Sequence, residues 1–201
     1  MGFAGFDLDM TLIDSRPAIM AAFTEVARET GVAIDLAAVD SRLGVKLEDE
    51  MTYWFPAGEQ VAALASYRRH YVRLAAEHTQ ALPGAAAALA AVRAAGDRVV
   101  IITAKHPVSV EPSLRAAGLT ADELYTHVFG PEKAEVLRTL SAVVYVGDSP
   151  PDMAAAVAAG VRAVGVSTGS FGEQALYEAG AEVVLDSLTG FPSWYRALAS
   201  A

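Results

Sequence analysis

From residue 81 onward the chain alternates helical patterns with short, continuous apolar segments. The segment Pro83–Gly96 predicts a helix, because a proline stands at its start and a glycine at its end. The apolar segment Arg98–Thr103 that follows predicts a strand. Strands that are apolar at nearly every position are typical of a parallel sheet whose two faces are both buried. The pattern therefore predicts an α/β fold with a doubly wound, Rossmann-like parallel sheet.

The same unit repeats to the end of the chain. Further strands are predicted at residues 127–129, 142–147, 162–166 and 182–185. The predicted helices between and after them cover residues 108–117, 131–140, 150–160, 172–180 and 187–199.

Residues 15–80 interrupt this alternation. Helical patterns occur at about 17–30, 36–43, 47–55 and 58–78, with no convincing strand among them. We therefore predict two domains, an α/β core formed by residues 1–14 and 81–201 and an all-helical cap formed by residues 15–80. Ligands of doubly wound sheets bind beyond the carboxyl ends of the strands, which is where this insertion leaves the first strand.

Composition limits the kinds of site that the chain can form. The absence of cysteine excludes disulfides and thiolate ligands, so carboxylates favour a hard cation such as Mg²⁺. The net charge of −9 argues against a nucleic-acid partner. No apolar run approaches the roughly 18 residues of a membrane span, and no signal segment is evident, so we expect a soluble, cytoplasmic protein without a membrane partner.

The first predicted strand ends in two aspartates one residue apart, Asp7 and Asp9, in the segment FDLDMTLIDS. If the extended conformation persists, both carboxylates project to the same side. Like charges held so close repel unless a cation or a shared proton intervenes, so such pairs often mark metal sites or acid–base catalysis. The alternative is a turn in which Asp9 and Thr11 only hydrogen-bond the backbone.

A second acidic group follows the predicted strand 142–147. Asp148 is expected to face Asp7 and Asp9 from a neighbouring strand, and such a cluster would be costly without a divalent cation. Asp152 has two open interpretations. It either joins the metal site, or it is the acidic residue of a helix start in which Ser149 is the N-cap.

Three polar residues complete the set at the predicted strand ends. Lys133 lies in the first turn of a helix, where a cation opposes the helix dipole, so it either pairs with a neighbouring glutamate or balances the carboxylates and holds an anionic substrate. Lys105 competes for that substrate role, with a solvated loop lysine as the alternative. Thr103 is either an ordinary strand residue or a hydroxyl that meets a phosphate oxygen.

Over nearly its whole length the chain resembles the haloacid dehalogenase superfamily, in particular its phosphatases with a small helical cap, such as phosphoglycolate phosphatases. DLDMTLIDS resembles the first motif of that superfamily, Thr103 the second, Lys133 the third and GDSPPD the fourth, in the right order. One departure is Met10, where the family usually has glycine. Met10 requires a backbone conformation that a residue with a Cβ tolerates.

The resemblance implies a magnesium-dependent phosphatase that hydrolyses a small phosphate monoester. Asp7 would attack phosphorus to form an aspartyl-phosphate, and Asp9 would protonate the leaving oxygen and then activate water. Mg²⁺ would be held by Asp7, the backbone carbonyl of Asp9 and Asp148, with Thr103 and Lys133 balancing charge. Alternatives are a phosphomutase or nucleotidase on the same core, or a non-catalytic phosphometabolite-binding module.

Substrate choice is expected in the cap, at the segment SRLGVKLEDE. Gly44 separates two helical segments there and is flanked by Arg42 and Lys46, which we predict to bind a second anionic or strongly polar group of a small phosphorylated metabolite. The alternative is a helix–turn–helix corner with two solvated cations. The expected assembly is a monomer or a homodimer.

Overall fold

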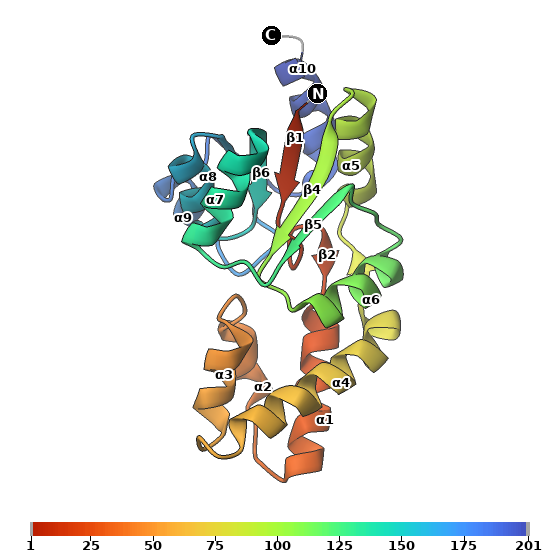
Figure 1. The fold of residues 1–201 in the computed structure, drawn as a ribbon, viewed down its shortest axis with the longest axis vertical. Coiled ribbons are helices and arrows are strands. Elements are labelled where there is room, and N and C mark those ends of the chain that lie inside the picture. The colour runs from red at the N-terminus through yellow and green to blue at the C-terminus, as the bar shows by residue number, and fades with distance from the viewer. Residues whose placement is uncertain (1, 200–201) are drawn as a thin grey trace.

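A computed structural model describes residues 2–199 and contains a six-stranded parallel sheet (Figure 1). The strand order is β5-β4-β1-β6-β7-β8, so the first strand of the chain lies in the middle of the sheet. The strands are β1 (Phe3–Phe6), β4 (Arg98–Thr103), β5 (Glu123–Thr126), β6 (Ala142–Gly147), β7 (Arg162–Val166) and β8 (Val183–Leu185). The predicted parallel α/β fold is thus confirmed.

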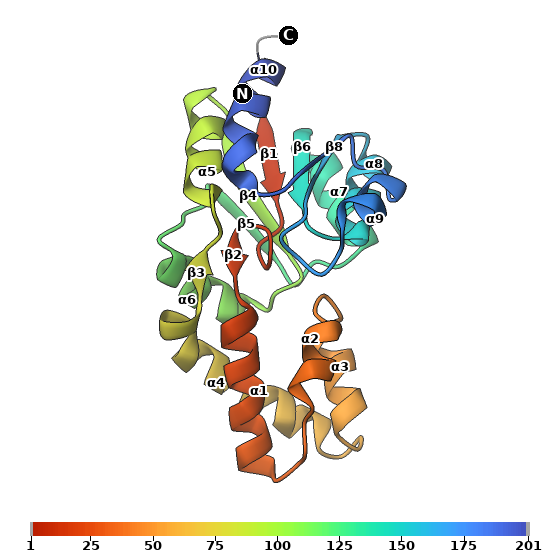
Figure 2. The same cartoon turned by 180° about the vertical axis from the view of Figure 1, so that it is seen from behind.

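Helices cover both faces of the sheet, as the apolar strands require (Figure 2). In β4, Val99 and Ile101 pack with α5 (Ala85–Ala94), α6 (Pro107–Ala117) and α10 (Phe191–Ala199), which follows the short 3₁₀ helix Leu188–Gly190. Val100 and Ile102 point to the other face, which is covered by α7 (Pro131–Leu140), α8 (Pro150–Ala159) and α9 (Glu173–Glu178). The two-residue period of a strand therefore places its apolar residues in two separate hydrophobic clusters.

Residues 15–80 form four helices beyond the carboxyl ends of the strands (Figure 1). They are α1 (Arg16–Thr30), α2 (Leu36–Ser41), α3 (Leu47–Trp54) and α4 (Gln60–His78). These helices bury a hydrophobic cluster of their own, which includes Phe23, Met51 and Tyr67. We refer to residues 15–80 as the helical insertion.

The chain enters and leaves the helical insertion through two short paired strands. β2 (Ile13–Asp14) and β3 (Gln80–Ala81) pair in antiparallel fashion, with Ile13 opposite Ala81 and Asp14 opposite Gln80. The sequence patterns did not predict this ribbon. It joins the two segments on either side of the insertion at nearly the positions where the sequence predicts the domain boundaries.

The strand predicted at residues 127–129 is wrong, because the strand that pairs with β4 is Glu123–Thr126. His127 has a φ of 60°, in the left-handed region, and therefore breaks the extended conformation. β5 lies at the edge of the sheet, where polar residues are tolerated on a partly solvated strand. The prediction followed the apolar residues after the strand instead.

No helix among residues 2–199 combines the length and the apolar character that crossing a membrane requires.

Candidate active site

The carboxyl ends of β1, β4 and β6 open into a cavity of about 540 Å³ between the sheet and the helical insertion. Eight of the nine predicted site residues line this cavity: Asp7, Asp9, Arg42, Thr103, Lys105, Lys133, Asp148 and Asp152. The ninth, Lys46, lies at its border and is treated separately below. One cavity thus brings together residues from distant parts of the sequence, from Asp7 to Asp152.

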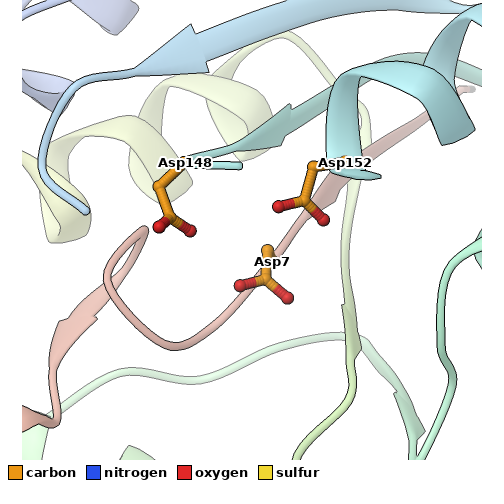
Figure 3. Close-up of side chains that lie close together, drawn as sticks. All are labelled: Asp7, Asp148 and Asp152. Carbon is orange, nitrogen blue, oxygen red and sulfur yellow. The ribbon is translucent and has the colours of Figure 1, made fainter. Parts of the chain in front are cut away.

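Three carboxylates meet at the sheet side of the cavity (Figure 3). Asp7, Asp148 and Asp152 each offer an oxygen, and these oxygens lie within 4.8 Å of one another. Asp7 follows β1, and its backbone N–H donates to the carbonyl of Val146 in the neighbouring strand β6 (2.8 Å). Because β1 and β6 are adjacent and parallel, the residues at their carboxyl ends are brought to one point.

Two glycines make room for these carboxylates. A Cβ placed on Gly169 would lie 1.9 Å from Oδ2 of Asp148, and a Cβ on Gly147 would lie 2.3 Å from the Cβ of Asp152. Neither distance is possible for a real side chain. The backbone at both positions therefore has to lack a Cβ for the aspartates to sit where they do.

Burial raises the pKa of Asp7 to about 7, although the nearby Lys133 opposes the shift. Burial also raises the pKa of Asp148 well above its ordinary value, with the charges of Asp7 and Asp152 acting in the same direction. These shifts mean that the ionised cluster is costly without a counter-charge. A divalent cation bound by carboxylate oxygens would supply that charge, so the chemistry of the donor set fits a hard metal ion.

Lys133 bridges two of the three carboxylates. Its Nζ donates to Oδ1 of Asp7 (2.8 Å) and to Oδ1 of Asp152 (2.7 Å). Burial lowers the pKa of Lys133, but Asp152 and Asp7 outweigh it and raise the pKa well above its ordinary value. Lys133 is therefore charged and compensates the cluster from within.

Asp152 belongs to this buried cluster. The Ser149 side chain makes no capping bond to the start of α8, and its hydroxyl instead donates to Oδ2 of Asp152 (2.5 Å). Oδ1 of Asp152 accepts from Lys133 and lies 3.2 Å from the hydroxyl of Tyr145, which also donates to the carbonyl of Ile102 (2.9 Å). Both oxygens of Asp152 are thus engaged, whereas Oδ2 of Asp7 accepts no hydrogen bond from the described residues.

Asp9 lies on the same side of the cavity, but its partner is Lys105. Lys105 Nζ donates to Oδ1 of Asp9 (2.7 Å) and lies 4.2 Å from the centre of the Tyr71 ring, which belongs to α4 of the helical insertion. Burial lowers the pKa of Lys105, but the charge of Asp9 outweighs it and the net shift is upward. The two predicted lysines therefore have different carboxylate partners, Asp7 and Asp152 for one and Asp9 for the other.

Thr103, the last residue of β4, is buried beside these groups. Its Oγ1 accepts a hydrogen bond from the backbone N–H of Lys105 (3.1 Å), and Thr103 lines the cavity. Because the oxygen is the acceptor in that bond, the hydroxyl proton remains available to a ligand oxygen.

Met10 adopts the left-handed conformation, with a φ of 59°. Its backbone N–H donates to the carbonyl of Ile13 (2.8 Å), and its carbonyl accepts from the hydroxyl of Thr168 (2.5 Å). The turn therefore takes the conformation that glycine adopts most easily, and these two hydrogen bonds hold a residue with a Cβ in it.

On the opposite wall, Arg42 and Lys46 belong to the helical insertion. Arg42 lines the cavity, and its Nε donates to Oε2 of Glu50 (2.8 Å). Lys46 is exposed and does not line the cavity, and its Nζ lies 4.2 Å from the ring centre of Phe129, which does line it. Of the two substrate-binding cations predicted in the insertion, only Arg42 lines the cavity, and the third predicted cation, Lys105, lines it from the core.

The sequence patterns missed several residues that support the site. Thr11, which donates to Oδ1 of Asp148 (3.1 Å), lies in the first motif, where the local pattern indicates only a turn residue. Tyr145 resembles any other residue of an apolar strand, and Gly169 lies in a loop without a recognisable motif. Glu50 lies on a helix with several acidic residues, so nothing local distinguishes it.

A family described as haloacid dehalogenase-like hydrolase matches residues 4–156. The chain is 30% identical over 207 residues to a plasmid-encoded phosphoglycolate phosphatase of Cupriavidus necator, which covers 93% of this chain and 90% of the relative. It is 33% identical over 178 residues to a phosphoglycolate phosphatase of Cereibacter sphaeroides, which covers 78% of this chain and 81% of the relative.

Solved structures share the fold across almost the whole chain. A predicted phosphoglycolate phosphatase from Haemophilus somnus superposes with a TM-score of 0.84 at 19% identity, covering 97% of this chain and 98% of that one. CbbY from Rhodobacter sphaeroides, solved in complex with phosphate, superposes with a TM-score of 0.79 at 23% identity, covering 94% and 95%.

Proposed function

The chain belongs to the haloacid dehalogenase-like hydrolases, and we propose that this phosphatase hydrolyses a small phosphate monoester with Mg²⁺ and an aspartyl-phosphate intermediate. The observation that carries the proposal is the buried cluster of Asp7, Asp148 and Lys133 at the carboxyl edge of the sheet. Such a concentration of buried charge is expensive, and a stable fold gains nothing from it that an apolar cluster would not supply. A role in catalysis would explain why these charged residues are buried together.

Asp7 is the proposed nucleophile. Its Oδ1 accepts from Lys133, while its Oδ2 accepts no hydrogen bond from the described residues and is free to attack phosphorus. Attack forms a bond between this oxygen and phosphorus and breaks the bond to the leaving alcohol. Lys133 would hold Asp7 in place, and both Lys133 and the Thr103 hydroxyl would donate to the phosphate oxygens as charge shifts between them.

Asp9 is the proposed acid and base. Lys105 holds Oδ1 of Asp9, and Oδ2 of Asp9 is left to carry the proton. Asp9 would give that proton to the leaving oxygen and then accept a proton from the water that hydrolyses the aspartyl-phosphate. Asp7 would thus act as the nucleophile and Asp9 as the acid and base of the same reaction.

Asp7, Asp148 and the backbone carbonyl of Asp9 are the proposed metal ligands, and Asp152 completes the carboxylate cluster. Mg²⁺ bound there would supply positive charge for the phosphate and relieve the repulsion among the carboxylates. Since Asp152 already uses both oxygens in hydrogen bonds, we propose that its main part is to hold Lys133.

We further propose that residues 15–80 act as a cap over the α/β core formed by residues 1–14 and 81–201. The separate hydrophobic cluster of the helical insertion supports this division. The similarity to phosphoglycolate phosphatases supports a phosphorylated hydroxy acid as the first substrate to test. A cytoplasmic location and assembly as a monomer or a homodimer remain predictions from the sequence.

The test is release of phosphate from 4-nitrophenyl phosphate by metal-free protein with and without added Mg²⁺. We expect activity only with Mg²⁺, reversible loss in excess chelator without unfolding, and poor replacement by Ca²⁺. Calcium prefers a larger and looser coordination sphere, which positions nucleophile and phosphate less well. Full activity in excess chelator would refute the proposed need for a metal ion. No activity with any metal ion would favour the alternative of a non-catalytic module that binds phosphometabolites.

A further inference from the structure

Glu50 is unusual among the charged residues of the helical insertion. Among residues 15–80 it is the only charged residue that is buried, with 5% of its surface exposed. Its Oε2 accepts from Arg42 Nε (2.8 Å) and its Oε1 accepts from Trp54 Nε1 (2.7 Å). A buried carboxylate costs free energy, so a carboxylate with both oxygens fixed in this way calls for a role beyond packing.

Arg42 is the residue that Glu50 holds. Its guanidinium lies 4.0 Å from the centre of the Tyr53 ring, so the pair with Glu50 and the contact with Tyr53 together fix both the plane and the direction of the group. Only Nε is used in the pair with Glu50. Neither Nη of Arg42 has a hydrogen-bond partner among the described residues, and Arg42 lines the cavity.

The other cations of the cavity wall are bound at their charged ends. Lys105 donates to Asp9, and Lys133 donates to Asp7 and Asp152. Arg68 donates through its terminal Nη2 to Glu48 (2.7 Å). Arg42 differs from them because its protein partner takes the inner nitrogen and leaves the two outer nitrogens, which suit a planar carboxylate, without a partner.

We propose that Glu50 is a positioning residue that presents the two Nη groups of Arg42 to a second anionic group on the substrate. This inference rests on the proposed phosphatase function, because it places the phosphate at the carboxylate cluster and the second anion at the opposite wall of the cavity. The substrate class is a phosphate monoester whose leaving alcohol carries a carboxylate or a comparable anion. Lys46, whose ammonium lies over the ring of Phe129, does not line the cavity and is not part of the site proposed here.

The experiment compares kcat/KM for two kinds of substrate in Arg42→Ala, Glu50→Gln and the double variant. The anionic probes are 2-phosphoglycolate, 3-phosphoglycerate and 6-phosphogluconate, and the neutral probe is 4-nitrophenyl phosphate. We define the preference as kcat/KM for an anionic probe divided by kcat/KM for the neutral probe. We expect the wild type to prefer at least one anionic probe. Arg42→Ala should reduce that preference about tenfold or more, as for a lost charge-assisted hydrogen bond. Glu50→Gln should reduce it in the same direction, mainly through KM.

The double variant separates positioning from a merely structural role. If Glu50 acts through Arg42, adding Glu50→Gln to Arg42→Ala causes no further loss of preference, because the positioned group is already absent. Equal losses on anionic and neutral probes, or additive losses in the double variant, would overturn the inference. Thermal unfolding checks the fold, and Trp54→Phe, which removes one bond to Glu50 and keeps an aromatic ring, replaces Glu50→Gln if that variant fails to fold.

The exposed pair of Arg28 and Glu25 on α1 provides a matched control. Glu25→Gln removes a carboxylate from an arginine of the same insertion, outside the cavity, and should leave the preference at the wild-type value. A wild type that hydrolyses 4-nitrophenyl phosphate but prefers no anionic probe overturns the second anion site alone. A wild type that hydrolyses none of the probes overturns the proposed function instead.

Discussion

The sheet side of the cavity and the helical insertion differ in where most of their charged groups lie. On the sheet side, Asp7, Lys133, Asp148 and Asp152 are buried together, and burial raises the pKa values of Asp7 and Asp148. In the helical insertion most charged groups lie at the surface, as Glu29 does with its partners. Exposed pairs contribute little to stability, whereas a buried cluster is costly and has to be compensated. The difference supports the proposal that the sheet side carries the chemistry and that the insertion acts as a cap.

The largest expected effect comes from Asp7→Asn. Turnover should fall by more than about a thousandfold, because an amide is a poor nucleophile. Stability should hold or rise, since the variant removes a carboxylate that burial and its like-charged neighbours disfavour, and Lys133 keeps Asp152 as its partner. Phosphate release and thermal unfolding measure the two effects. Normal turnover in protein free of contaminating phosphatase would eliminate Asp7 as the nucleophile.

A subtler change at the same wall is Gly169→Ala. The new Cβ would collide with Oδ2 of Asp148, so the carboxylate has to move. A displacement of this kind in an active site costs about a hundredfold in kcat/KM. Gly172→Ala is the matched control, because a Cβ there meets nothing within 4 Å, and it should behave as the wild type. Equal activity of the two variants would mean that the position of Asp148 is unimportant.

Phe55→Ala tests whether the helical insertion is a separate unit. Phe55 is 3% exposed within the cluster of the insertion, and its loss should cost that unit about 3–5 kcal/mol. Hydrogen exchange should then speed up in α1, α3 and α4 while β1 and β6 keep their protection. Phe6→Ala in the sheet should do the reverse. If either variant loosens both regions equally, the two form one cooperative unit and the proposed division fails.

The smallest expected effect is on the acid stability of the protein and involves Glu29, on the surface of the insertion. A hydrogen bond from Ser66, then one from His70, lowers the pKa of Glu29 from its ordinary value of 4.5 to about 2. Because the folded-state pKa is the lower one, the stabilisation is present above about pH 4.5 and is lost as the pH falls toward 2. Glu29→Gln should therefore flatten the loss of stability over that range. An unfolding midpoint that depends on pH identically in both proteins would contradict the assignment.

The parallel sheet and the sheet side of the cavity could be predicted because both follow from short-range patterns. Continuous apolar strands imply two covered faces, and the carboxyl ends of parallel strands share one edge, so the sequence predicts Asp7, Thr103 and Asp148 at one place. The edge strand β5 was misplaced because an edge strand needs no continuous apolar run. The pair of Glu50 with Arg42 could not be predicted, since helix α3 places it through tertiary packing that leaves no local signal.

The most direct test of the account is to trap the covalent intermediate. Protein mixed with substrate and Mg²⁺ is quenched rapidly in acid, digested and examined by mass spectrometry, with Asp7→Asn as the control. We expect one phosphoryl group on the peptide that contains Asp7, at the side chain of Asp7, and none in the control. A phosphoryl group on another residue, or active enzyme that carries none at any quench time while releasing phosphate, would contradict it.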